Sequence, residues 1–183
     1  MNDRFTGRRA HLQSVERNST EYEAASRDAI VDLTRRMEHA WNTGDASAYA
    51  ASFAPDSDYI AFDGSHLRGR DANARHHQRL FDSVLRNTRL VFEGAPTVRF
   101  VADDVAVVHT MGSVLFPWQR HVTAKRRSNQ TLVAVRRPEG WRFTAFHNTR
   151  YRPTALPTGV SLKLILALFR ARVWWSRKRR RRA

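Results

Sequence analysis

The stretch Trp41-Asn42-Thr43-Gly44-Asp45 predicts a tight corner between two helices. Gly44 can adopt the left-handed backbone conformation that ends a helix, because glycine has no Cβ to clash. Asp45 can cap the next helix, since its carboxylate accepts a hydrogen bond from a free backbone N–H of the first turn. The corner therefore separates a first helix from a second.

The segment before the corner has the apolar spacing of one helix face. Four apolar side chains carry this pattern: Ile30, Leu33, Met37 and Trp41. Such spacing predicts an amphipathic helix packed on a core. Thr20 and Glu23 have the spacing of a capping box, so we expect the helix to start at Thr20. Residues 1–19 are polar, without the apolar stretch of a secretory signal, and we expect a mobile arm.

The segments after the corner predict short helices and then strands. A short helix should carry Tyr49 and Phe53, and a further helix should start at Gly69-Arg70-Asp71. We expect two short extended runs before that helix, at residues 58–62 and 66–68, and four after it, at residues 89–101, 105–116, 122–137 and 141–151. Three helices followed by a four-stranded antiparallel meander predict an α+β fold, a curved sheet wrapped around helices. Such a cone leaves a cavity between helix and sheet, where small ligands bind.

Length and charge divide the chain into parts. A chain of 183 residues suits one domain with a real core, which we place at residues 20–152. Residues 153–159, with two prolines and a glycine, predict a linker, and residues 160–183 a basic tail. The net charge is +15, and no Asp or Glu occurs from Pro153 onward, so the excess charge lies mostly in the tail. The absence of cysteine excludes disulfides and thiolate chemistry and is compatible with a cytoplasmic protein.

Two ordered sets of motifs carry a family resemblance. The first is Trp41-Asn42-x-Gly44-Asp45, Phe53-x-x-Asp56, Tyr59, Gly64, Gly69-Arg70 and His77-x-x-Leu80-Phe81. The second is Ser128-x-x-Thr131-x-Val133, Gly140-Trp141 and His147-Asn148-Thr149-Arg150. In this order they resemble the SnoaL-like branch of the nuclear-transport-factor-2-like superfamily. The second set is similar to its SgcJ/EcaC group, whose members are labelled oxidoreductases and often occur near natural-product biosynthesis genes. The resemblance covers roughly residues 25–152.

The resemblance implies a cone-shaped α+β barrel, a homodimer packed through the sheet, and a pocket for a flat apolar or polyketide-like metabolite. It implies oxidoreductase, isomerase or cyclase-type activity, or binding without turnover, because one fold hosts many functions. No Gly-x-Gly-x-x-Gly motif occurs, so we expect no cofactor. We expect no metal either, since His76 and His77 are adjacent and point in different directions.

His77 is the sharpest candidate for a catalytic base, because it lies on an otherwise apolar helix face where burial can tune its pKa. The alternative is a hydrogen-bonded core histidine. Trp41, Tyr59 and Phe81 are candidate substrate-binding residues that line the pocket. For these aromatic side chains, structural packing is the alternative, since aromatics supply much of any core.

Three polar residues on the predicted strands are the remaining candidates for the pocket. These are His109, Gln130 and Asn148, of which Asn148 is the second catalytic candidate. On the concave face they would polarise a carbonyl or hydroxyl of the substrate; on the convex face they would make dimer contacts. Strand phase leaves both open, because one register step moves every side chain to the other face. Arg150 would bind an anionic group or pair with Asp56 or Asp58.

The tail has the features of a helix that lies in a membrane surface. Its apolar residues at helical spacing are Leu162, Ile165, Leu166, Phe169 and Val173. Lys163, Arg170 and Arg177 form a basic stripe beside them, and Trp174 and Trp175 precede an arginine run. This pattern predicts an anionic membrane partner and a protein peripheral to the inner face of the membrane. The second hypothesis for the tail is binding to nucleic acid or another polyanion, and the third is a solubilising extension without a partner.

Overall fold

The computed structural model describes residues 3–152 and 159–180, with side chains described for residues 19–152, 162–172 and 175. The chain divides into two compact units, residues 1–151 and 152–183. The predicted linker lies outside the described residues, apart from residue 159. The second unit consists of one described helix, α4 (Gly159–Arg180). Among the described residues, no helix combines the length and the apolar character needed to cross a bilayer.

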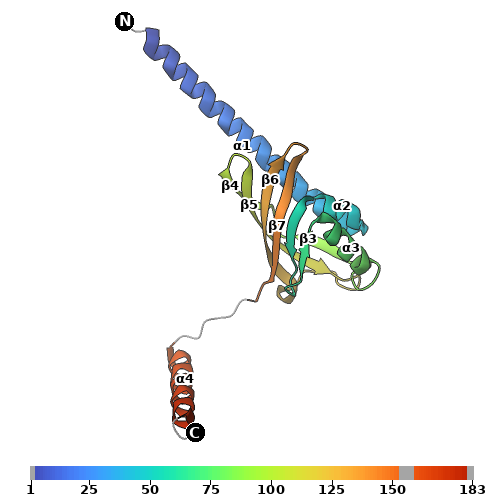
Figure 1. Ribbon diagram of the computed structural model, residues 1–183, viewed down its shortest axis with the longest axis vertical. Helices are drawn as coiled ribbons and strands as arrows, with labels where there is room; N and C mark the ends of the chain where they lie inside the picture. The colour runs from blue at the N-terminus through green and yellow to red at the C-terminus, as the bar shows by residue number, and fades with distance from the viewer. Residues whose placement is uncertain (1–2, 153–158, 181–183) are drawn as a thin grey trace. The chain divides into compact units, whose positions relative to one another are not determined.

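The first unit has the predicted α+β class, with helices first and most strands after them (Figure 1). Its helices are α1 (Asp3–Thr43), α2 (Ala46–Ala51) and α3 (Arg70–Phe81), with a 3-10 turn η1 (Ala124–Arg126). Its strands are β1 (Phe53–Ile60), β2 (His66–Arg68), β3 (Arg89–Phe92), β4 (Thr97–Ala102), β5 (Val105–Leu115), β6 (Arg127–Arg137) and β7 (Gly140–Arg150).

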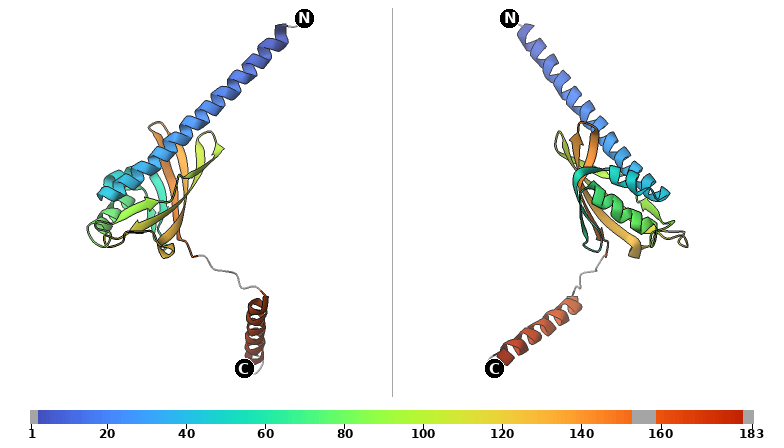
Figure 2. Two further views of the ribbon diagram at one scale, coloured as in Figure 1. Left: turned by 180° about the vertical axis from the view of Figure 1, so that it is seen from behind. Right: turned by 45° about the vertical axis from the view of Figure 1, so that its right-hand side comes forward.

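The strands form one seven-stranded sheet in the order β2-β1-β7-β6-β5-β3, and β4 also pairs with β5. All pairings are antiparallel except β1 with β7, which run parallel. The sheet curves, and α2, α3 and the later turns of α1 lie on its concave side (Figure 2). The predicted architecture, a curved sheet wrapped around helices, is therefore confirmed.

The register of β6 and β7 defines the inner face of the sheet. Leu132 and Phe146 are paired, and their side chains are buried in the core. Gln130 and Asn148 are also paired, and each lies two residues away from the buried pair on its own strand. Because paired residues of antiparallel strands share a face and side chains alternate along each strand, Gln130 and Asn148 also point inward.

Several predicted boundaries are wrong in informative ways. Helix α1 begins at Asp3, so Thr20 lies inside a helix and does not start one. Helix α2 ends at Ala51, and Phe53 belongs to β1. The predicted strand over residues 89–101 is divided into β3 and β4, because Gly94 between them takes a φ of +82°. The first part of the predicted strand 122–137 is η1.

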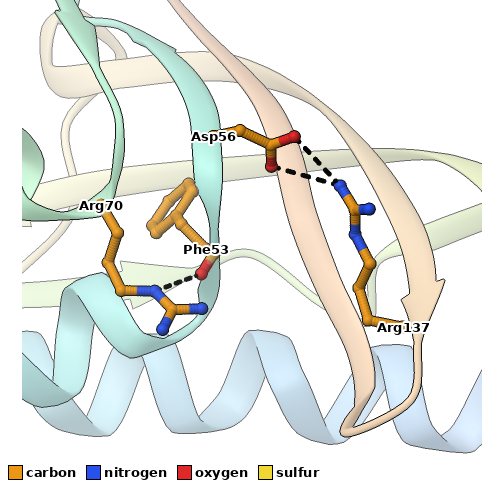
Figure 3. Close-up of polar contacts among 4 residues, drawn as sticks. All are labelled: Phe53, Asp56, Arg70 and Arg137. Carbon is orange, nitrogen blue, oxygen red and sulfur yellow. Dashed lines mark hydrogen bonds and ion pairs between the residues drawn. The ribbon is translucent and has the colours of Figure 1, made fainter.

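Two arginines tie β1 to its neighbours (Figure 3). Arg70 Nε donates a hydrogen bond of 2.7 Å to the Phe53 carbonyl oxygen, which joins α3 to β1. Arg137 contacts the Asp56 carboxylate at 3.2 and 3.3 Å, which joins the end of β6 to β1. The expected pair between Arg150 and Asp56 is therefore absent, and the Arg150 guanidinium lies over the Phe62 ring. The other expected partner, Asp58, contacts His66.

Candidate functional site

Helix α3 is fixed against β1 by a glycine at its start. Gly69 takes a φ of +82°, and a Cβ at this position would lie 3.1 Å from the Pro55 carbonyl oxygen. Its N–H donates to the Ser57 carbonyl oxygen at 2.7 Å. The helix then presents three buried side chains to the sheet: Asn73, His77 and Phe81. A glycine-dependent turn thus decides which face of α3 lines the interior.

His77 is a buried histidine with a defined tautomer. Its Nδ1 lies 3.0 Å from the Asn73 carbonyl oxygen, and because a carbonyl only accepts, Nδ1 carries the proton. Nε2 is then the acceptor, and among the described residues it makes no hydrogen bond. Burial lowers the pKa of His77 to about 4, against a smaller raising effect of the Asn73 hydrogen bond. His77 is therefore neutral at pH 7 and best suited to accept a hydrogen bond.

Four aromatic side chains and the imidazole of the neighbouring His76, at 5.7 Å, surround His77. The centroid distances are 4.4 Å to Tyr49, 5.2 Å to Tyr59, 5.8 Å to Trp41 and 5.9 Å to Phe81. Trp41 also donates a hydrogen bond from Nε1 to Thr88 Oγ1 at 3.2 Å, which fixes its indole ring. These rings supply both core packing and an aromatic wall around the bare nitrogen of His77.

Tyr59 connects the surroundings of His77 to the sheet. Its ring stacks on Phe146 with centroids 4.3 Å apart and an interplanar angle of 10°. Its hydroxyl lies 3.3 Å from the hydroxyl of Tyr49. Burial raises the pKa of Tyr59 to about 12 and also raises the pKa of Tyr49. Both phenols are therefore neutral at physiological pH.

The inner face becomes polar farther along β6 and β7. Thr110 donates a hydrogen bond of 2.8 Å to the side-chain oxygen of Gln130. Asn148 lies beside Gln130 on the same face. A Cβ at Gly112 would lie 3.1 Å from the Phe92 ring and 3.4 Å from Gln130 Nε2, so a side chain here would have to displace the Phe92 ring. The missing side chain at Gly112 leaves room for the Gln130 amide.

Several buried polar atoms of this interior have no hydrogen-bond partner within the described part of the chain. They are Ser57 Oγ, both amide atoms of Asn73, and Asn148 Oδ1. A buried polar group without a partner costs about 1–3 kcal/mol, and native proteins satisfy nearly all of them. An ordered water or a ligand on the inner face would satisfy these atoms.

Most of the sequence-predicted residues come together in this interior. They are Trp41, Tyr59, His77, Phe81, Gln130 and Asn148. His109 does not join them: it pairs with Thr131, lies on the opposite face of the sheet and is exposed. The expectation that His109, Gln130 and Asn148 share one face is wrong, because His109 and Gln130 differ by one step of the strand alternation.

Three polar residues of the interior were not among the sequence-predicted site residues, namely Tyr49, Ser57 and Asn73. The sequence does indicate that Asn73 points inward, because Asn73 lies four residues before His77 and so one helical turn away on the same face. The sequence gives no such indication for Ser57, because the inward direction of its side chain depends on how β1 pairs in the sheet.

An open groove of about 540 Å³ lies between α1, α2 and the β6–β7 turn. Its charged lining residues are Arg36, Asp45, Glu139 and Arg142. None of the sequence-predicted site residues lines it. No group of three or more potential metal ligands occurs within residues 3–152 and 159–180.

A family model described as a SnoaL-like domain matches residues 30–148. A solved structure from Nostoc punctiforme PCC 73102, a domain of unknown function with a cystatin-like fold, is 34% identical with a TM-score of 0.65. The match covers 80% of this chain and 86% of that one. The search of curated proteins gave no match.

Two structures from Novosphingobium aromaticivorans share the fold at lower identity. One is an NTF2-like protein with a cystatin-like fold, 22% identical, with a TM-score of 0.59 and coverage of 85% and 95% of the two chains. The other is a putative scytalone dehydratase, 15% identical, with a TM-score of 0.61 and coverage of 78% and 95%. At these identities the likeness is one of fold.

Proposed function

Since the chain belongs to the family of SnoaL-like domains, we propose that it binds a small organic molecule on the inner face of its sheet, beside His77. The unpartnered buried atoms of Asn73 and Asn148 carry this proposal. They offer acceptors and a donor in an interior that is otherwise aromatic, and a ligand with hydroxyl or carbonyl groups would satisfy them.

The chemistry of the lining suggests which ligand fits. Aromatic rings favour a flat, partly apolar molecule, since rings stack or pack edge to face. His77 Nε2 and Asn148 Oδ1 are acceptors, so the ligand should carry hydroxyl groups. A polyketide-like metabolite has these properties. The resemblance to the SgcJ/EcaC group supports this class, and so does the fold shared with a putative scytalone dehydratase.

Turnover at this site would rest on His77 and Asn148. His77 would accept a proton from a ligand hydroxyl, and the Asn148 amide would polarise a carbonyl. With a pKa of about 4, His77 is a weak base at neutral pH, which favours binding over proton abstraction. Our first hypothesis is therefore a carrier or binding module. Our second hypothesis is an enzyme with oxidoreductase, isomerase or cyclase-type chemistry.

Ligand capture tests this proposal. Full-length protein is incubated with a native lysate, recovered, and its bound small molecules are identified by mass spectrometry. We expect a hydroxylated aromatic compound in the wild type and its loss in His77→Ala. His109→Ala is the matched control, because it removes an exposed histidine from the other face of the sheet. Equal capture by all three proteins would contradict the site.

A second candidate function is that of an interaction module, a homodimer through the sheet that the basic tail localises. The outer face supports it, because Val107, Val133 and Val135 lie there only half-buried. The lack of cysteine fits a cytoplasmic site, and the tail fits an anionic surface, either the inner face of the membrane or a polyanion.

A further inference from the structure

The second unit carries many basic side chains and no acidic ones. Residues 153–183 contain no Asp or Glu. Their cations are Lys163, Arg170, Arg172, Arg177, Lys178, Arg179, Arg180, Arg181 and Arg182. No charge within this unit can neutralise them, so their counter-charges must come from elsewhere. A partner for this unit should therefore be anionic.

Helix α4 also exposes a continuous set of apolar side chains. The exposed fractions are 41% for Leu162, 62% for Leu164, 50% for Ile165, 48% for Leu166, 64% for Leu168 and 65% for Phe169. A run of large exposed apolar residues marks an interaction surface, because folded proteins rarely leave such patches in water. An anionic partner of α4 must therefore also offer an apolar phase.

The apolar residues lie on two sides of α4, separated by cations. At about 100° per residue, Leu162, Ile165 and Phe169 share one side, and Leu164 and Leu168 lie across the helix. Lys163 and Arg170 lie between the two sides. The apolar surface is thus wider than the single stripe that the sequence pattern predicts. Lysine and arginine stems are long enough to keep their charges in water while the helix beside them is covered.

We propose that α4 binds in the interfacial layer of an anionic lipid bilayer, with its leucines and Phe169 in the acyl boundary and its cations among the headgroups. The proposal specifies the anionic surface that the second candidate function leaves open. It does not depend on ligand binding beside His77. Anchoring by α4 would concentrate the SnoaL-like unit near apolar metabolites that partition into the same bilayer.

Two other partners fit α4 less well. A nucleic acid would satisfy the cations but would leave the exposed leucines in water, since phosphate contacts need no apolar surface. A second copy of α4 would cover the leucines but would bring two strongly basic helices together without an acidic residue on either. Of these three partners, the anionic lipid surface alone satisfies both the charge and the apolar residues.

Vesicle flotation of the full-length protein tests the proposal. The vesicles contain equal parts of phosphatidylglycerol and phosphatidylcholine, and pure phosphatidylcholine vesicles serve as the uncharged comparison. We expect flotation with the anionic vesicles and at least tenfold weaker partition to the uncharged ones. The triple variant Lys163→Gln, Arg170→Gln, Arg172→Gln should partition about 100-fold less to the anionic vesicles, because each cation near an anionic surface strengthens partition about fivefold.

The apolar contribution needs its own variant. Leu162→Ser, Ile165→Ser and Phe169→Ser together keep every charge and should also reduce partition at least 100-fold. The matched control is Arg86→Gln, Arg89→Gln, Arg99→Gln, which removes the same charge from exposed positions of the first unit. This control should float like the wild type.

Three results would overturn the proposal. One is flotation that the serine variant retains, since binding would then be purely electrostatic. Another is an equal loss of flotation in the first-unit control. The third is a wild type that does not float but binds duplex DNA or self-associates through α4. Because His77→Ala leaves α4 unchanged, it should float normally, so loss of flotation and loss of ligand capture report on different parts of the chain.

Discussion

At the scale of single residues, His77 is held neutral by its surroundings. Its Nδ1 is occupied by the Asn73 carbonyl, and rings from three helices and one strand enclose it. A charged imidazolium at this place would have no carboxylate beside it, since the shell is made of aromatic rings. The fold therefore prefers one protonation state, and this preference makes stability depend on pH.

The direction in which the pKa of His77 is shifted decides whether stability rises or falls with pH. The pKa of His77 is about 4 in the folded protein and near 6.5 when unfolded, so the unfolded state binds more protons in between. The free energy of unfolding should fall by about 3 kcal/mol as the pH drops from 6.5 to 4. Urea unfolding at several pH values measures it.

Two variants isolate this contribution from the protonation of carboxylates. His77→Leu should lose the His77 part of the slope between pH 6.5 and 4. His109→Leu should keep it, because His109 is exposed on the outer face. The same slope in all three proteins would show that His77 does not carry the effect.

The buried amide of Asn73 should lower the stability of the free protein and contribute to ligand binding. Its amide is buried without a partner among the described residues, so Asn73→Leu should raise the free energy of unfolding by about 1–3 kcal/mol. The same substitution should abolish ligand capture. Asn42→Leu is the matched control and should lower the free energy of unfolding. The Asn42 amide hydrogen-bonds both the N–H and the carbonyl oxygen of Leu90, and the substitution removes both bonds. A destabilised Asn73→Leu would mean that the amide is already satisfied.

At the scale of elements, the turn from β2 to α3, which packs against β1, controls the site. The backbone of Gly69 has a φ of +82° and a ψ of 155°, a region that is essentially restricted to glycine. The turn aims Asn73 and His77 at the sheet. The position of the site residues therefore depends on a glycine that has no side chain of its own.

Substitution of this glycine should be costly. Gly69→Ala combines a strained φ with a Cβ 3.1 Å from the Pro55 carbonyl oxygen, so we expect about 2–4 kcal/mol of destabilisation. Gly64→Ala is the matched control, because its φ is +87° but nothing lies within 4 Å of the added Cβ. Gly64→Ala should cost about 1 kcal/mol. Thermal unfolding of both variants compares them, and equal costs would mean that the close approach is unimportant.

At the scale of the whole molecule, the chain combines two units that differ in how far they bury their apolar side chains. The first unit buries its apolar residues around His77, and the second leaves its leucines exposed. The outer face of the sheet is a third surface, with half-buried valines beside His109 and Thr131. The interior around His77, the outer face and the tail can therefore be altered one at a time.

The proposed homodimer can be tested on this outer face. Val133→Lys places a charge among the half-buried valines and should convert a dimer into monomers of 21.2 kDa, as measured by light scattering. Val84→Lys is the matched control, since Val84 is 66% exposed after α3 and should leave the dimer intact. A wild type that scatters as a monomer would contradict the dimer itself.

Local sequence patterns were enough to predict the fold class and most elements. The helical spacing from Ile30 to Trp41 and the turn at Gly44-Asp45 place α1 and α2, because these signals act over a few residues. The extended runs at residues 105–116 and 141–151 were also predicted from local sequence and correspond to β5 and β7. The family-like motif order then predicted the cone, and the apolar spacing around His77 predicted that this residue lies on an inward helix face.

Only the tertiary structure decided which polar residues share the interior. Along a strand, side chains alternate, so the separation of His109 from Gln130 depends on how β5 pairs with β6. The parallel pairing of β1 with β7, which turns Ser57 inward, joins segments about ninety residues apart. Such long-range pairing leaves no local trace in the sequence, whereas the helix face that carries Asn73 and His77 does.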